Sequence, residues 1–177
     1  LTFIQEWAHP LTTINYTVLG IASGLVLIAA LAVLMGVGDF AHVAALWGLL
    51  FTLLAATTRT ASLVRNARLR PRSTLQSATG IHADRIVQTS MGMSAGAFNT
   101  REFFHGKPMW LVRRIKMASL LLTFAIPAIL LSLVLALEQP VWLFAAVVVQ
   151  FIGLIGDRWF FFAQARHPQN LYYQLVS

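Results

Sequence analysis

The 177-residue sequence contains no cysteine, and only 11% of its residues are charged. Without cysteine the chain forms no disulfide, uses no thiol nucleophile, and offers no thiolate to zinc or to an iron–sulfur cluster. It also contains no P-loop, dinucleotide-binding fingerprint, HExxH motif or Ser-His-Asp arrangement. We therefore expect no catalytic, cofactor-binding or metal-binding residues in this chain.

Apolar residues, in contrast, make up 58% of the sequence, and the mean hydropathy is +0.71. Four runs of 32, 19, 21 and 18 residues carry no charge. About 20 apolar residues in a helix cross a hydrocarbon core of about 30 Å, and a helix leaves no backbone group unpaired in lipid. We expect an all-α integral membrane protein with spans near residues 14–36, 40–58, 116–137 and 140–160.

Turn residues in "MGVGDF" and "LEQP" group the spans into two hairpins within a single membrane domain, residues 1–177. A long polar loop, residues 59–115, joins the hairpins. Its first part, "TTRTASLVRNARLR", fits a basic helix that continues the second span along the membrane surface. Within the spans, Pro127 is expected to kink the third helix. The spacing of Gly20 and Gly24 permits a close helix contact.

All 13 lysine and arginine residues lie on one side of these spans. Eleven fall between Arg59 and Lys116, and Arg158 and Arg166 lie at the end of the last span, whereas both turns carry only acidic residues. By the positive-inside rule, we expect a multi-pass membrane protein with the loop and both chain ends on the cytoplasmic side. Membrane topology also explains the net charge of +7. We expect no nucleic-acid binding, because the sequence has no basic stripe on a polar fold.

Histidines argue against a haem in this chain. A b-type haem within the membrane needs an axial pair at matching depth on facing helices. His42 lies within the second span, near the acidic turn, and the other four histidines lie at or beyond the opposite boundary. We expect no haem and no iron–sulfur cluster bound by this chain.

The stretch "TREFFHG" gathers charge beside two phenylalanines. Arg101 and His105 are four residues apart and share a face if the stretch is helical, with Glu102 beside Arg101. One interpretation is an interfacial segment that buries its phenylalanines and solvates its charges. Another is a docking surface for a second subunit, formed by Arg101, Glu102, His105 and Arg158, or a polar group near a quinone headgroup. Arg158 also fits an anchor that reaches the interface.

Four stretches carry a resemblance to a known family: "EWAHPLTT" (6–13), "STLQSATGI" (73–81), "NTREFFHG" (99–106) and "GDRWFFFAQARHPQNLYY" (156–173). In their order and spacing they resemble membrane anchor subunits of the dimethyl sulfoxide reductase type, which belong to molybdenum enzyme complexes. Those anchors have eight spans, and this chain is similar to their second half. The resemblance therefore implies the C-terminal part of a longer subunit. The histidine and glutamate of the family's quinol site lie in the first half and have no counterpart here.

The resemblance implies a non-catalytic subunit of the bacterial cytoplasmic membrane. Such an anchor holds an iron–sulfur electron-transfer subunit and a molybdopterin catalytic subunit at the membrane and exchanges electrons with the quinone pool. In the bacterial dimethyl sulfoxide reductase the catalytic subunits face the periplasm, whereas the charge pattern here places the equivalent face in the cytoplasm. A related cytoplasm-facing group oxidises sulfite, so sulfite oxidation stands beside reduction of a sulfoxide or related oxyanion. Half of a transporter and a membrane scaffold without redox coupling are the alternatives from other classes.

Overall fold

The computed structural model describes residues 4–70, 72–87, 89, 103–104 and 106–166, and all regular structure in these ranges is helical. The elements in order are α1 (Pro10–Leu34), α2 (Gly38–Ala67), α3 (Leu75–Thr79), α4 (Met109–Leu120), the π-helical segment η2 (Leu121–Ala125), α5 (Ile126–Leu137) and α6 (Val141–Ala163). The elements α4, η2 and α5 form one helix of 29 residues. Together with α1, α2 and α6 this gives four helices long and apolar enough to cross a membrane, which confirms the predicted fold class.

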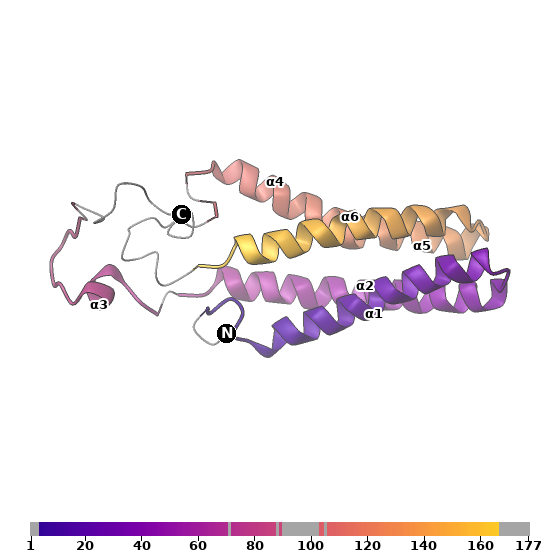
Figure 1. Cartoon of the computed structure of the whole chain (residues 1–177), viewed down its shortest axis with the longest axis horizontal. Coiled ribbons are helices and arrows are strands. Elements are labelled where there is room, and N and C mark those ends of the chain that lie inside the picture. The colour runs from indigo at the N-terminus through magenta and orange to yellow at the C-terminus, as the bar shows by residue number, and fades with distance from the viewer. Residues whose placement is uncertain (1–3, 71, 88, 90–102, 105, 167–177) are drawn as a thin grey trace.

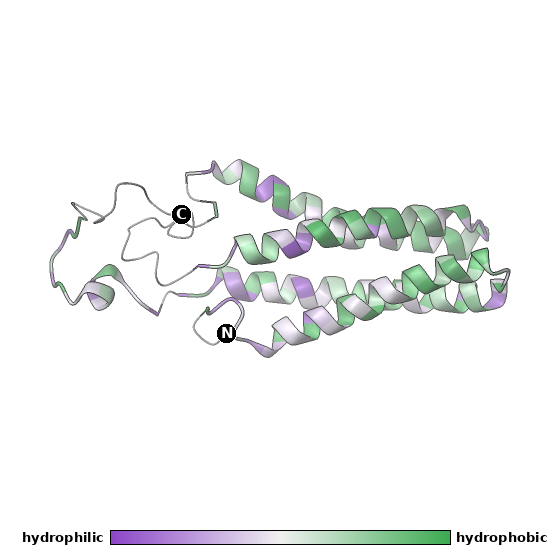
Figure 2. Ribbon diagram, viewed as in Figure 1, coloured by the Kyte–Doolittle hydropathy of each residue, from purple (hydrophilic) through white to green (hydrophobic). Residues whose placement is uncertain are grey.

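The helices form two antiparallel hairpins that lie side by side (Figure 1). We call the end with the two tight turns, residues 35–37 and 138–140, the turn end, and the end where α2 and α6 finish the loop end. The residues before α1, the short helix α3 and the end of α6 all lie at the loop end (Figure 1). Hydrophilic residues are concentrated in the half of the bundle nearer the loop end, and hydrophobic residues dominate the other half (Figure 2). This arrangement agrees with the two hairpins and the one-sided charge expected from the sequence.

Local sequence sets the helix ends. Pro10 occupies the first turn of α1, where a missing N–H costs nothing, and the side chain of His9 accepts a hydrogen bond from the backbone N–H of Leu11 at 3.1 Å. At the turn end, Gly36 follows α1 with a φ of 74°. Glu138 follows α5 with a φ of 54° and is a non-glycine residue in the left-handed region. Both hairpins therefore reverse through a left-handed residue.

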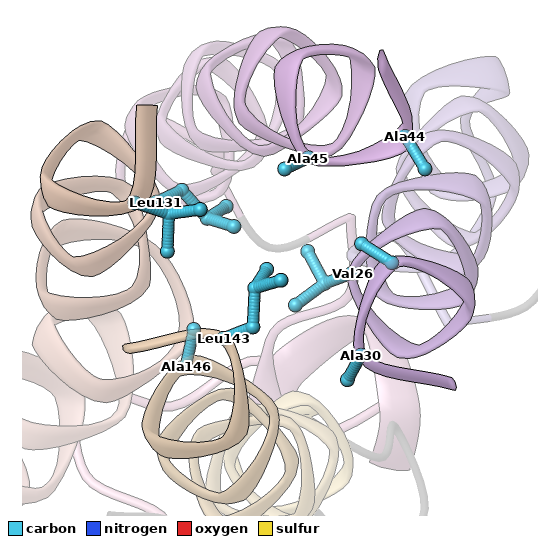
Figure 3. Close-up of a cluster of buried hydrophobic side chains, with 9 residues drawn as sticks. Val26, Ala30, Ala44, Ala45, Leu131, Leu143 and Ala146 are labelled. Atoms are coloured by element: carbon cyan, nitrogen blue, oxygen red, sulfur yellow. The ribbon is translucent and has the colours of Figure 1, made fainter. Parts of the chain in front are cut away.

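Both α2 and α6 carry a regular stripe of buried residues that faces the interior of the bundle. On α2 the stripe contains Ala45, Gly48, Thr52, Ala55, Arg59 and Ser62, and on α6 it contains Leu143, Ala146, Gln150, Gly153, Asp157 and Phe160. Spacings of three and four residues alternate on both helices, which keeps each stripe on one face of its helix. Both helices run from the turn end to the loop end and lie diagonally across the bundle, with α1 and α5 between them (Figure 3), so that side chains at equivalent levels face each other across the interior.

Toward the turn end the core is apolar and built from small residues. Its buried cluster contains Val26, Ala29, Ala30, Ala44, Ala45, Leu131, Val134, Leu143 and Ala146. Figure 3 shows these side chains converging from all four helices, with Val26, Leu131 and Leu143 filling the space between the alanines. Alanine lets helix backbones approach closely, which stabilises helix contacts inside a membrane.

Two helices extend beyond the predicted spans into the loop. α2 runs to Ala67, past the span predicted to end near residue 58, and the third long helix begins at Met109, before the span predicted from residue 116. The stretch "TTRTASLVRNA" continues α2 without a break, as its interpretation as a helix that continues the second span predicted. The prediction ended each span at its first charge, but a charge ends only the hydrophobic run. Arginine is a good helix former, and Arg59 is buried because Asp157 pairs with its charge inside the bundle, as described below.

The third span is continuous but not regular. Pro127, which was expected to kink it, lies two residues after η2, and the N–H of Ile126 donates to the carbonyl of Leu121, five residues earlier. Toward its N-terminus α4 draws away from α6 (Figure 1). The irregularity therefore takes the form of a π-helical turn just before the proline.

The two-hairpin topology gives a labelling prediction. We expect single cysteines at Ser73 and Gln139 to react with a membrane-impermeant maleimide from opposite sides of the membrane, because the two positions lie at opposite ends of the bundle. The chain has no cysteine of its own, so each signal reports one position. Labelling of both positions from the same side of sealed vesicles would contradict the four-span topology.

Candidate functional site

A buried ion pair links the two hairpins near the loop end. Nε of Arg59, on α2, donates to Oδ1 of Asp157, on α6, at 2.8 Å. The two side chains are only 2% and 1% exposed. Ionisable residues inside a membrane bundle are rare because each charge must leave water, and they persist only when paired. Arg59 and Asp157 satisfy that condition with each other.

Arg158 adds a second cation to the same carboxylate. Its Nη2 donates to Oδ2 of Asp157 at 2.5 Å, and its side chain is 23% exposed. The guanidinium carbon of Arg158 lies 4.2 Å from the centre of the Tyr16 ring on α1 and 5.5 Å from that of Phe161. Cation–π contacts of this kind hold an arginine in a fixed orientation. We call Arg59, Asp157 and Arg158 the basic centre.

A second polar contact lies two helical turns deeper in the bundle. Nε2 of Gln150, on α6, is 3.3 Å from Oγ1 of Thr52, on α2, and 3.5 Å from the carbonyl oxygen of Thr123, on η2. Proline has no N–H, so Pro127 cannot donate to the carbonyl of Thr123, four residues earlier. The Gln150 amide provides a donor for that carbonyl, at the long end of the hydrogen-bond range. The glutamine therefore compensates for the proline across the interface between α6 and η2.

The two polar levels have the same spacing on both helices. Thr52 and Arg59 are seven residues apart on α2, and Gln150 and Asp157 are seven residues apart on α6. Seven residues of helix rise by roughly 10 Å. Each level pairs one residue of α2 with one of α6, so both levels fix the same register between the hairpins. A shift by one turn would separate both pairs, as polar residues at core positions do in coiled coils.

Aromatic rings surround the basic centre at the loop end. The rings of Trp7 and Phe161 stack at 5.6 Å, and Nε1 of Trp7 is 3.4 Å from the carbonyl oxygen of Phe161. The segment before α4 reaches α6 through Phe103 and Phe104, whose ring centres lie 5.1 and 5.7 Å from that of Trp159. Such a layer is typical of the membrane–water boundary. It joins the N-terminal segment and the segment before α4 to the end of α6.

Of the four residues predicted to dock a partner subunit, the structure describes only Arg158. Arg101, Glu102 and His105 lie outside the described residues. Phe103 and Phe104, from the same stretch, contact α6, although Phe103 remains 61% exposed. These contacts agree with an interfacial segment that uses its phenylalanines as an anchor. The docking role of the charged residues, including Arg158, stays a prediction.

Sequence reasoning missed the ion pair between Arg59 and Asp157. Arg59 was assigned to the start of the loop, and no partner was predicted for Asp157. A signal was present, because the polar residues of the second and fourth spans repeat at the same interval of seven. An interval alone does not say which two spans face each other across the bundle, so the pairing itself required the structure.

At the turn end the structure places His42 on the surface, beside a cavity of about 560 Å³. Its polar lining side chains are Asp39, His42 and Glu138, and all three are exposed. In the part of the chain that the structure describes, no three His, Cys, Asp or Glu side chains gather as a metal site would require. The expectation that this chain binds no cofactor stays a prediction.

Comparison with known proteins finds a relative of similar sequence. The chain is 44% identical over 175 residues to a protein of Allochromatium vinosum that is named as a subunit of a sulfite dehydrogenase. The aligned region covers 99% of this chain and 54% of that protein, so the chain spans about half the length of this curated relative. No family model matches the chain, and no solved structure matches it. Identity at this level over nearly the whole chain indicates common descent with the matching half of that protein.

Proposed function

We propose that this chain is part of the membrane anchor subunit of a molybdopterin oxidoreductase complex that oxidises sulfite and passes the electrons to quinone. The observation that carries the proposal is the 44% identity to a protein named as part of a sulfite dehydrogenase. The four apolar helices support the membrane role. In this proposal the chain itself is non-catalytic and holds an iron–sulfur subunit and a molybdopterin subunit at the bilayer.

The chemistry divides naturally between such subunits. Sulfite and water give sulfate, two electrons and two protons, and a quinone takes up two electrons and two protons to become a quinol. Sulfite is a small dianion that stays in water, whereas quinones dissolve in the bilayer, so electrons must cross from a soluble module to a membrane subunit. This chain has no cysteine to bind an iron–sulfur cluster, so the clusters belong to partner subunits. Its contribution is attachment and contact with the lipid-soluble acceptor.

Charge supports the loop end as the partner-binding face. In the described part of the chain the loop end carries nearly all the cations, and the positive-inside rule assigns this end to the cytoplasm. A cytoplasm-facing sulfite-oxidising complex is consistent with that orientation, and the relative's name favours sulfite over reduction of a sulfoxide. We place Arg101, Glu102, His105 and Arg158 in the surface that receives the iron–sulfur subunit.

Half of a transporter is the second candidate, and one observation favours it. Buried ion pairs and irregular helices are features of transport pathways, and this chain has both Arg59–Asp157 and η2. The redox proposal explains the same features as structural, because the pair fixes helix register and η2 is compensated by Gln150. The two candidates differ in what must co-purify with the protein.

A purification experiment tests the proposal. We expect the complete membrane subunit, tagged and extracted in mild detergent, to co-purify with molybdenum, iron and sulfite-dependent quinone reduction. Deleting the subunit should move sulfite oxidation, assayed with a soluble dye, into the soluble fraction and abolish quinone reduction by membranes. Sulfite oxidation that stays membrane-bound in the deletion strain would contradict the anchor role. A purified subunit without metal or redox activity would favour the transporter.

A further inference from the structure

The basic centre contains more positive than negative charge. Arg59 and Arg158 share the one carboxylate of Asp157, and no other carboxylate forms an ion pair with either arginine among the residues the structure describes. Within the same residues, two donors of the centre, Nη2 of Arg59 and Nε of Arg158, are buried without a hydrogen-bond partner. Guanidinium donors removed from water need acceptors. The centre therefore carries one positive charge that no anionic group of the described chain balances.

Only one side of the centre is open to such a group. Arg59 and Asp157 are almost fully buried, whereas the Arg158 side chain is 23% exposed. Tyr16, against which Arg158 lies, is 41% exposed, and Trp159, the next residue of α6, is 40% exposed. Arginine, tyrosine and tryptophan are the residues most enriched at the energetic centres of protein interfaces. The open side of the centre thus has the composition of a binding surface at the loop end.

We infer that an acidic side chain of the subunit docked at the loop end completes the basic centre by an ion pair with Arg158. This inference rests on the proposed function for the existence of that subunit, and it adds the chemistry of the contact. Arg158 uses one of its five N–H groups on Asp157, so donors remain for a second carboxylate. The planar guanidinium also suits a carboxylate better than it suits a neutral group.

Asp157 and Arg59 act in this contact as positioning residues. Asp157 holds the guanidinium of Arg158 through Oδ2, while Arg59 holds Asp157 through Oδ1. The Tyr16 ring lies against the guanidinium, as its 4.2 Å distance shows. An arginine that is already oriented loses less side-chain entropy when it binds. The buried pair of Arg59 and Asp157 thus orients Arg158 at the surface before the partner binds.

The test measures binding of the detached soluble module to the complete membrane subunit in nanodiscs. We expect Arg158→Gln to raise the dissociation constant at least about 30-fold, which is the loss of affinity typical of a desolvated charge pair. The matched control is Arg114→Gln, an exposed arginine that lies 5.0 Å from the Trp110 ring on α4 and has no ion pair in the described chain. The control should change the dissociation constant less than about threefold.

Positioning is tested by the double variant Arg59→Met, Asp157→Leu, which removes the buried charges but keeps the packing. The expected result is a folded subunit that binds the module about tenfold more weakly, with Arg158 still present. An unchanged dissociation constant in Arg158→Gln overturns the inference. If that variant loses bound anionic lipid instead, measured by native mass spectrometry, the missing group is a phospholipid phosphate. Failure of the wild-type subunit to bind the module overturns the proposed function as well.

Discussion

Replacing Asp157 by alanine is expected to destabilise the helix bundle by about 3–5 kcal/mol, because it leaves the buried Arg59 charge without a counter-ion. Arg59 is 2% exposed, so water does not replace the lost carboxylate. Arg158 loses its partner in the same step, and two like charges then lie close together in a medium of low polarity. The free energy of unfolding, measured by SDS titration of the purified subunit in mixed micelles, checks the prediction.

Three variants separate the charge from the side-chain volume. Asp157→Asn keeps the shape and removes the charge, so it should lose most of the same stability. Arg59→Met with Asp157→Leu removes both charges and should recover most of it, because an apolar pair of similar size avoids the desolvation cost. Asp84→Ala, at an exposed loop position, is the control and should leave the free energy unchanged. If the double variant is no more stable than Asp157→Ala, side-chain packing at these positions, and not charge, determines the free energy of unfolding.

The sequence predicted the architecture well, for a simple physical reason. Charge is so costly in lipid that its absence over about 20 residues locates a span, and glycine or proline between two such runs locates a turn. A span located by its uncharged residues is shorter than its helix, since a helix does not stop where its hydrophobic stripe stops. α2 runs on to Ala67, as the basic stretch after the second span predicted, and its residue Arg59 pairs with a residue 98 positions away.

The candidate site depended on knowing which helices face each other. Arg59 and Asp157 each looked like boundary charges, and only the placement of α2 and α6 on opposite sides of one bundle interior brings their side chains to 2.8 Å. The role of Gln150 was equally hidden, because it depends on a carbonyl left free by Pro127 in another helix. By contrast, the concentration of cations at one end followed from composition alone. The sequence alone therefore predicts which end of the bundle is positively charged. The ion pair and the glutamine contact can be assigned only from the packed helices.

The position of the closest helix contact is a third case, because the glycine spacing in the sequence indicated other glycines than the structure does. Gly20 and Gly24 were expected to allow a close helix contact. A Cβ added at either would meet no atom within 4 Å in the described chain. The closest approach occurs at Gly153, where an added Cβ would lie 2.4 Å from the backbone of Leu122 and Thr123. Single glycines at the seam between α6 and η2 therefore matter more than the paired glycines of α1.

Gly153→Ala is accordingly expected to force α6 and η2 apart. A contact of 2.4 Å with backbone atoms cannot be relieved by rotating a side chain, so a helix must move. The movement would also lengthen the contact between Gln150 and the Thr123 carbonyl, which is already 3.5 Å, and leave that carbonyl unpaired beside Pro127. Overpacking of this kind costs about 1–3 kcal/mol, to which the lost contact adds.

Gly156→Ala provides the matched control one turn further along the same helix. Its added Cβ would lie 3.5 Å from Cβ of Ser119, an ordinary van der Waals contact. Alanine is the better helix former by up to about 1 kcal/mol, so this variant should be neutral or slightly stabilising. The two glycine-to-alanine changes should therefore differ by about 2–4 kcal/mol in the free energy of unfolding, measured by SDS titration of the two purified variants side by side. Equal effects would mean that α6 and η2 are not in backbone contact, and the role of Gln150 in satisfying the proline-freed carbonyl would fail with it.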